Sequence, residues 1–82
     1  MELLKPAQRD LSDLPVDIRQ RVDKRLMRLE EEPFSHDSEK LVGTQRTRRV
    51  RVGKYRIVYY VIGKLIHVTA IGHRKEIYRS IF

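Results

Sequence analysis

The fold is decided by the stretch "TRRVRVGKYRIVYYVIGKLIHVTAI", residues 47–71, in which the spacing of apolar side chains changes to a period of two. Val50 and Val52 alternate with two arginines, a pattern that predicts a β-strand. Arg49 and Arg51 then share one face of that strand. The segments that follow, "KYRIVYYVI" and "LIHVTAI", are rich in β-branched and aromatic residues, which favours two further strands.

Two short glycine-containing connections join these strands. A Gly-Lys pair occurs at residues 53–54 and again at residues 63–64, and such pairs suit tight antiparallel turns. Three strands joined by two tight turns form a meander. Its middle strand, Tyr55–Ile62, carries Arg56, and a charge on a central strand needs a partner or a function.

The preceding half of the chain is predicted to be helical. Pro6 suits the first turn of a helix that runs through "PAQRDLSDLP" until Pro15 interrupts it. In "VDIRQRVDKRLMRLEEE", residues 16–32, apolar side chains recur at intervals of four, four and three, which predicts a second helix that Pro33 ends. "MELL" is too short to decide between strand and coil. "EEEPFSHDSEK", residues 30–40, is predicted to be a polar linker.

These elements predict one α+β domain over residues 1–82. An N-terminal helical hairpin packs on a small antiparallel β-sheet and covers one face, and the other face is partly open. The longest apolar run is too short for a membrane span, and charge and proline come too early for a signal peptide. We therefore expect a soluble protein of the cytoplasm, which the absence of cysteine also suits.

The basic residues are unevenly distributed along the chain. The formal net charge is +7, but residues 1–39 hold seven basic and ten acidic side chains, whereas residues 40–82 hold eleven basic and one acidic. Such a concentration of positive charge predicts a polyanionic partner. Nucleic acid is favoured over a membrane surface, because the basic residues lie among predicted strands and not on an amphipathic helix.

The sequence offers little support for metal or cofactor chemistry. The three histidines share no metal-ligand spacing, cysteine is absent, and no glycine-rich phosphate loop occurs. No serine stands near a base and an orienting acid in the sequence. We expect no metal, no small-molecule cofactor and no membrane partner.

A set of basic and aromatic residues remains as the candidate site: Arg49, Arg51, Arg56, His73, Arg74 and Tyr78. Guanidinium groups match phosphate oxygens in shape and charge. Metal-free RNA cleavage directs the ribose 2′-OH at the adjacent phosphorus, which requires positive charge and groups that move two protons. His73 and Tyr78 are the proton-transfer candidates. A solvated edge strand also accounts for Arg49 and Arg51, and ring packing against the sheet end also accounts for Tyr78.

Three segments together resemble a known family. "RVRVGKYRIVYYVIGKLIHVTAIGHRKEIYR", preceded by "LPVDIRQRVDKRLMRLEEEP" and "KLVGTQR", is similar to the RelE/ParE superfamily of bacterial and archaeal toxins. The resemblance runs from about Leu4 to Tyr78. It implies a RelE-like fold with a short N-terminal strand, a helical hairpin and a curved antiparallel sheet. Only "MEL" precedes the resemblance, so the N-terminal strand is expected to be clipped.

The RelE branch implies an activity as well as a fold. Its members enter the ribosomal A site and cut messenger RNA by 2′-OH attack, which leaves a 2′,3′-cyclic phosphate without a metal. The positions that the branch uses fall here at Arg49, Arg51, Arg56, Arg74 and Tyr78. RelE proteins typically have lysines on the first meander strand, and an arginine cannot give up its proton. Proton transfer is therefore left to Tyr78 or His73.

Two other functions stay open at this point. The ParE branch has a similar fold but inhibits DNA gyrase without an enzymatic role, and a degenerate member keeps the fold but has lost toxicity. Arg74 and Tyr78 favour the RelE branch. In either branch the resemblance implies a cognate antitoxin, whose amphipathic C-terminal segment covers the basic surface.

Overall fold

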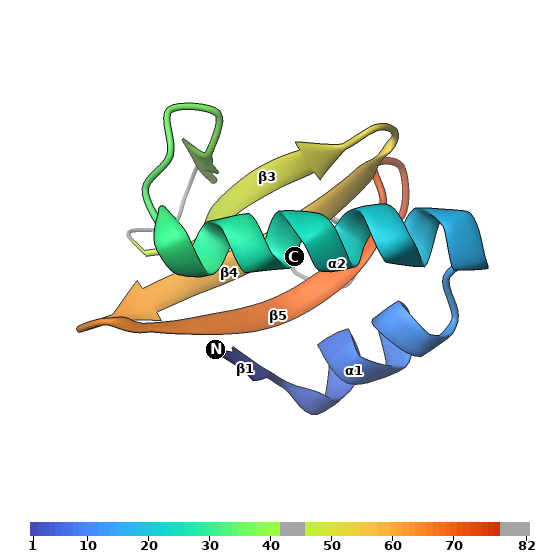
Figure 1. Ribbon diagram of the computed structural model, residues 1–82, viewed down its shortest axis with the longest axis horizontal. Helices are drawn as coiled ribbons and strands as arrows, with labels where there is room; N and C mark the ends of the chain where they lie inside the picture. The colour runs from blue at the N-terminus through green and yellow to red at the C-terminus, as the bar shows by residue number, and fades with distance from the viewer. Residues whose placement is uncertain (42–45, 78–82) are drawn as a thin grey trace.

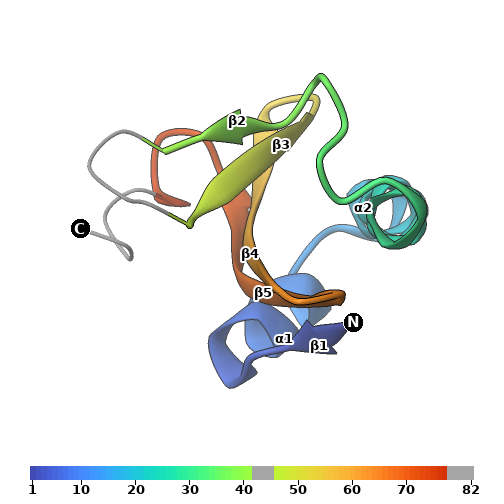
Figure 2. The ribbon, with the colours of Figure 1, turned by 90° about the vertical axis from the view of Figure 1, so that its left-hand side faces the viewer.

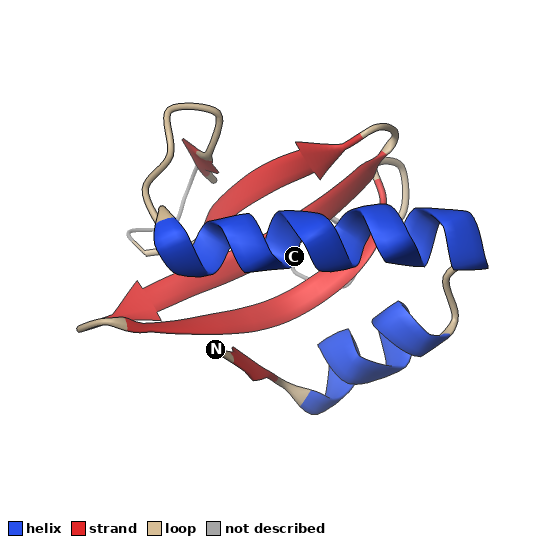
Figure 3. Cartoon of the chain, viewed as in Figure 1, coloured by secondary structure: helices blue, strands red, loops and turns tan. Residues whose placement is uncertain are grey.

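The predicted meander lies at the centre of the molecule and consists of β3 (Arg48–Val52), β4 (Tyr55–Ile62) and β5 (Leu65–His73) (Figure 1). The computed structural model describes residues 1–41 and 46–77 of the chain. Within them the chain forms two helices and a five-stranded sheet (Figure 3). In chain order the elements are β1 (Glu2–Leu3), α1 (Lys5–Ser12), α2 (Val16–Glu31), β2 (Glu39–Lys40), β3 (Arg48–Val52), β4 (Tyr55–Ile62) and β5 (Leu65–His73).

The sheet has the strand order β1-β5-β4-β3-β2. β1 runs parallel to β5, and the other neighbours are antiparallel. The predicted α+β fold is confirmed, but the sheet is mixed and not wholly antiparallel. β2 lies within the predicted polar linker; two residues are too few to show a period of two. The strand "MELL" is present as the two residues of β1.

The two helices cover different parts of the sheet. α2 crosses one face, and Val22, Leu26 and Leu29 bury its apolar side in the main core. α1 packs against β5 and β1, at the opposite edge of the sheet from β2 (Figure 2). Ala7 of α1 is fully buried in the same core, which is completed by Val50, Val52, Ile57, Tyr59, Ile66, Val68 and Ile71. Burial of each valine, leucine or isoleucine side chain in this core contributes roughly 1.5–3 kcal/mol to the free energy of unfolding.

A β-bulge bends the sheet in its middle. Val58 pairs with Ala70 and Tyr59 pairs with Val68, so Thr69 is an extra residue on β5. The hydroxyl of Thr69 donates to the Val58 carbonyl oxygen at 3.2 Å. A bulge increases local twist and bends its strand, consistent with the curved sheet in Figure 2.

Within the described residues, no helix is both long and apolar enough to cross a membrane.

A buried arginine fixes the chain where it leaves α2. Arg25 is only 6% exposed, and its Nη2 atom donates to both carboxylate oxygens of Asp37 at 2.9 and 3.0 Å and to the Ser35 hydroxyl at 3.1 Å. The Ser35 hydroxyl in turn donates to Asp37 at 2.6 Å. This hydrogen bond and the positive charge of Arg25 lower the pKa of Asp37 below its ordinary value of 3.8.

We expect Asp37→Asn to lower the free energy of unfolding by about 1 kcal/mol near neutral pH, a modest figure because the carboxylate is half exposed. Since the pKa of Asp37 is lowered in the folded protein, its contribution is present above the ordinary value of 3.8 and is lost as the pH falls below that value. Urea unfolding curves at a series of pH values measure the difference.

Asp23 provides the matched control, because it is exposed on α2 and forms no ion pair with the described residues. Asp23→Asn should change the free energy of unfolding by less than about 0.5 kcal/mol at every pH. Equal losses for the two variants, or a loss for Asp37→Asn that persists in acid, would contradict this role of the Arg25–Asp37 pair.

Candidate functional site

The sheet face opposite α2 carries the three predicted strand arginines. Val50 and Val52 point into the main core, so the alternation of β3 turns Arg49 and Arg51 to the other face. Arg56 on β4 lies on that face as well, because its neighbours Tyr55 and Ile57 point the other way and Ile57 is in the core. We call Arg49, Arg51 and Arg56 the arginine face.

Arg51 and Arg56 are direct cross-strand partners in the pairing of β3 with β4. Like charges directly opposite one another are destabilising by roughly 0.2–1 kcal/mol. Arg56 is also 8% exposed, and its Nη1 atom donates to the carbonyl oxygens of Gly53 and Tyr55 at 3.3 and 3.1 Å. Both acceptors lie beside the β3–β4 turn, so the buried guanidinium is held at that end of the sheet.

Arg49 differs from Arg51 in having an anionic partner. Its Nη2 atom lies 2.7 Å from the Oε2 atom of Glu39, which is also its cross-strand partner on β2. The Arg49 side chain is 14% exposed. Arg51 is exposed and forms no ion pair with the residues that the structure describes. Strand β2, which was not predicted from the sequence, thus supplies Glu39 as an anionic partner for Arg49. The charge of Arg51 remains available to an anion.

Arg74 is brought to the same end of the sheet by a backbone contact. It follows β5 directly, and its backbone N–H donates to the Lys54 carbonyl oxygen at 2.9 Å. Lys54 belongs to the β3–β4 turn, beside the carbonyl groups that hold Arg56. The structure therefore gathers the backbone of Arg74 with the Arg51–Arg56 pair. Tyr78 lies outside the described residues.

His73 is placed differently from the other predicted site residues. It is the last residue of β5 and not the first after it, and it pairs with Tyr55 while Gly72 pairs with Arg56. The Tyr55 and His73 rings meet edge to face at 5.7 Å between centroids. Adjacent residues of a strand face opposite sides, so His73 lies on the α1 side of the sheet, away from Arg56.

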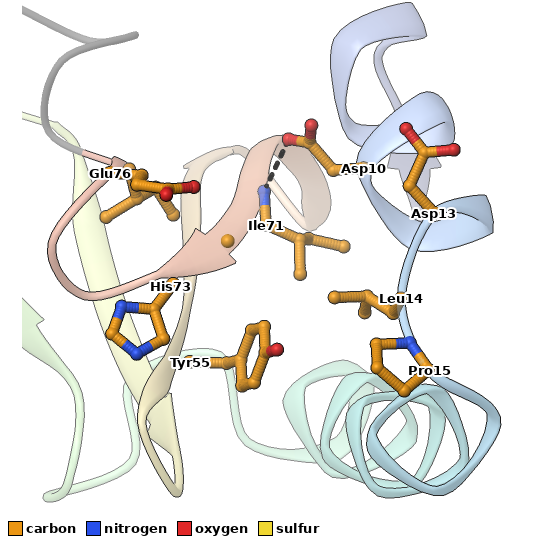
Figure 4. Close-up of a pocket in the computed structure, with 10 residues that line it drawn as sticks. Asp10, Asp13, Leu14, Pro15, Tyr55, Ile71, His73 and Glu76 are labelled. Atoms are coloured by element: carbon orange, nitrogen blue, oxygen red, sulfur yellow. Dashed lines mark hydrogen bonds between the residues drawn. The ribbon is translucent and has the colours of Figure 1, made fainter.

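Figure 4 shows the pocket that His73 lines together with Tyr55, Asp10 of α1 and the α1–α2 connection. The pocket has a volume of about 260 Å³. Asp10 on its wall accepts a hydrogen bond from the backbone N–H of Ile71 at 2.9 Å, which attaches α1 to β5. The Nδ1 atom of His73 accepts from the backbone N–H of Lys75 at 3.2 Å. His73 is thus held at the end of β5, on the α1 side of the sheet and away from the arginine face.

A second apolar cluster lies on the same face as the arginines. It consists of Leu41, Val58, Ala70 and Ile77, all buried. Val58 is the cross-strand partner of Arg49, so the cluster adjoins the arginine face. This cluster could not be predicted from the sequence, because Leu41 and Ile77 stand outside the segments with a regular period. Among the described residues, no group of three His, Asp or Glu side chains is arranged to hold a metal ion.

Comparison with known proteins shows that the chain is similar to toxins. Residues 1–78 match the family described as "ParE toxin of type II toxin-antitoxin system, parDE". No curated protein matches the sequence. A chain of the RelB–RelE antitoxin–toxin complex from Methanococcus jannaschii is 29% identical, with a TM-score of 0.79 and 95% of each chain covered.

Two further solved structures have a similar fold. A chain of the archaeal RelE–RelB complex from Pyrococcus horikoshii OT3 is 30% identical, with a TM-score of 0.75, over 89% of this chain and 91% of that chain. The isolated E. coli RelE toxin is 22% identical, with a TM-score of 0.78, over 99% and 96% of the two chains. The last comparison supports the fold alone.

The Arg51–Arg56 pair predicts a gain in stability when one of its charges is removed. We expect Arg51→Thr to raise the free energy of unfolding by about 0.2–1 kcal/mol, because it relieves the repulsion from Arg56. The gain should shrink as salt is added, because salt screens exposed charges. Urea unfolding at low and high salt measures both effects.

Arg49→Thr is the matched control on the same strand and face. It introduces the same strand propensity but removes a partner of Glu39, so its stability should be lower than that of Arg51→Thr. If the two variants have the same stability at low salt, repulsion between Arg51 and Arg56 is not the cause.

Proposed function

Because the chain belongs to the ParE toxin family of the RelE/ParE superfamily, and is the toxin of a toxin–antitoxin pair, we propose that it is a metal-independent, ribosome-dependent endoribonuclease that cleaves messenger RNA. The observation that supports this most is the direct pairing of Arg51 with Arg56 on the face that α2 leaves uncovered. Two cations held together at a cost to stability are expected where an anion must be bound.

The proposed reaction is an internal phosphoryl transfer. The 2′-oxygen attacks the adjacent phosphorus, the bond from phosphorus to the 5′-oxygen breaks, and the products are a 2′,3′-cyclic phosphate and a 5′-hydroxyl end. The proton of the 2′-hydroxyl goes to a base, and the 5′-oxygen receives a proton as it leaves. Charge on the phosphoryl oxygens grows during attack, so prearranged cations favour the transition state over the ground state.

Each arginine has a role that follows from its environment. Arg51, exposed and available, contacts the scissile phosphate, and Arg56 adds a buried, positioned charge beside it. Arg49 anchors a neighbouring phosphate in competition with Glu39. Arg74 stabilises the transition state or the leaving group from the turn after β5.

Arginine stays protonated at any cellular pH, so the proposed proton transfer needs another residue. We propose Tyr78 rather than His73, because His73 lies on the opposite side of β5 from the arginine face.

Dependence on the ribosome is consistent with this set of residues. The arginines bind and stabilise a phosphate, but in-line attack also requires the 2′-hydroxyl, phosphorus and 5′-oxygen to be aligned. A message held in the ribosomal A site has a fixed backbone, which supplies that alignment. The toxin would accordingly act in the cytoplasm.

The proposed protein partner is a cognate antitoxin. The structures from Methanococcus jannaschii and Pyrococcus horikoshii are described as RelB–RelE and RelE–RelB complexes. An acidic, amphipathic antitoxin segment would cover the arginine face and remove its charge from solvent. The match to a family described as ParE supports a second candidate, a non-enzymatic inhibitor of DNA gyrase, and a degenerate, non-toxic toxin is the third.

The test is induced expression with mapping of message 5′ ends, on ribosomes and on free RNA. We expect new 5′ ends on ribosome-bound messages only. Arg51→Thr and Arg74→Ala should each slow cleavage about 100-fold or more, as the loss of a donor to a developing anion does in other enzymes. Tyr78→Phe should slow it by about 100-fold through lost proton transfer, and His73→Gln should slow it less than about threefold.

Arg19→Gln, exposed on α2, is the matched charge control and should cleave as the wild type does. DNA damage with intact messages would identify a gyrase inhibitor instead. Normal growth and intact messages after induction would identify a degenerate toxin.

A further inference from the structure

A strongly basic groove lies between α2 and the β3–β4 turn and adjoins the arginine face at Arg51. It has a volume of about 410 Å³. Its lining consists of Arg21, Lys24, Arg25, Arg28, Arg51, Val52 and Gly53. No carboxylate is among these residues, and Val52 is the one aliphatic side chain. We call this site the α2 groove.

The α2 groove arises from the spacing of basic residues on the helix. Lys24 and Arg25 each stand three or four residues from both Arg21 and Arg28, so the four side chains line one flank of α2. The acidic residues of the helix do not line the groove, although residues 1–39 as a whole have more acidic than basic side chains. Charge counted along the chain therefore conceals a local cluster of cations.

Gly53 makes room for one of these cations. Its φ of +59° is required by the tight β3–β4 turn and is poorly tolerated by residues with a Cβ atom. A Cβ atom at this position would also lie 3.3 Å from the Nη2 atom of Arg21. The guanidinium of Arg21 therefore lies close against the turn, at the groove wall.

Most of the charge in the α2 groove has no carboxylate partner in the part of the chain that the structure describes. Arg25 is engaged by Asp37, but Arg21, Lys24, Arg28 and Arg51 form no ion pair within 4.0 Å among the residues that the structure describes. Several cations in one concave site add up to a strong positive potential, which attracts a polyanion. The groove also shares Arg51 with the arginine face, so one continuous polyanion can contact both.

We infer that the α2 groove binds the phosphodiester backbone of RNA next to the bond that is cleaved. The inference rests on the proposed function, which supplies RNA as the substrate. RNA is favoured over an acidic protein segment by the scarcity of apolar side chains in the groove. Guanidinium groups bind phosphate and carboxylate oxygens alike, so the arginines establish only that the partner is anionic. An amphipathic peptide also requires apolar pockets for its anchor residues, and Val52 alone does not supply them.

The test measures binding without cleavage. Arg21→Gln, Lys24→Gln and Arg28→Gln are combined in one variant, and Lys5→Gln, Arg19→Gln and Lys64→Gln in a control variant with the same net charge. The control positions are exposed and lie outside the groove. The probe is a fluorescein-labelled single strand of 2′-O-methyl RNA, which has no free 2′-hydroxyl for the proposed attack, and its anisotropy is read over a series of salt concentrations. Urea unfolding shows that both variants are folded.

We expect the groove variant to bind the RNA about tenfold or more weakly and the control variant less than about threefold more weakly. The slope of log affinity against log salt should fall by about two for the groove variant. Equal weakening of the two variants would overturn the inference, since net charge alone would then account for binding. So would a groove variant that binds RNA as the wild type does but loses affinity for labelled poly-L-glutamate, which would indicate an acidic protein partner.

Failure of this inference and failure of the proposed function are distinguishable. The binding assay involves neither ribosomes nor cleavage, so a protein that does not cut messages can still show the groove-dependent affinity. Conversely, the wild-type protein could cleave messages as proposed while the groove variant binds RNA as tightly as the wild type does. That result would overturn the inference about the α2 groove and leave the proposed function standing.

Discussion

The register of β3 on β4 is the constraint on which both the core and the candidate site depend. The Gly53-Lys54 turn places Val50 opposite Ile57 and Arg51 opposite Arg56. Because side chains alternate, a slip of one residue would expose the valines and turn the arginines toward α2. The core thus enforces a pairing of like charges that strand pairing alone disfavours. Apolar burial on one face of the sheet stabilises a cationic site on the other.

The basic residues fall into two groups, those whose charge is engaged by a partner within the protein and those whose charge can bind an external anion. Asp37 engages Arg25, and Glu39 engages Arg49, while Arg48 donates to the Ser38 hydroxyl and lies over the Phe34 ring. Arg51 is exposed, and no described residue forms an ion pair with it. Arg51 belongs both to the arginine face and to the α2 groove, so the two surfaces for which we propose anion binding meet at this residue. A count of basic residues would not separate these roles, because the partners lie ten or more residues away.

Much of the fold could be predicted from the sequence. Period-two alternation predicted β3, composition and two short turns predicted β4 and β5, and intervals of three and four predicted α2. β2 could not be predicted, since two residues between a helix and a strand carry no period. Alternation on β3 predicted that Arg49 and Arg51 share a face, whereas the place of Arg56 on that face follows from the pairing of β3 with β4. The side of His73 could not be predicted, because the bulge at Thr69 shifts the alternation of β5 by one residue. The α2 groove required the three-dimensional packing of Arg21 on the β3–β4 turn.

The central claim is that Arg51 and Arg56 together form the binding site for the scissile phosphate. A crystal structure of the toxin bound to an RNA strand with 2′-O-methyl groups tests it most directly. The account predicts one phosphate whose oxygens lie within hydrogen-bond distance, about 2.7–3.2 Å, of the Arg51 guanidinium, with Arg56 beside it. An RNA strand bound with every phosphate away from this pair would contradict it.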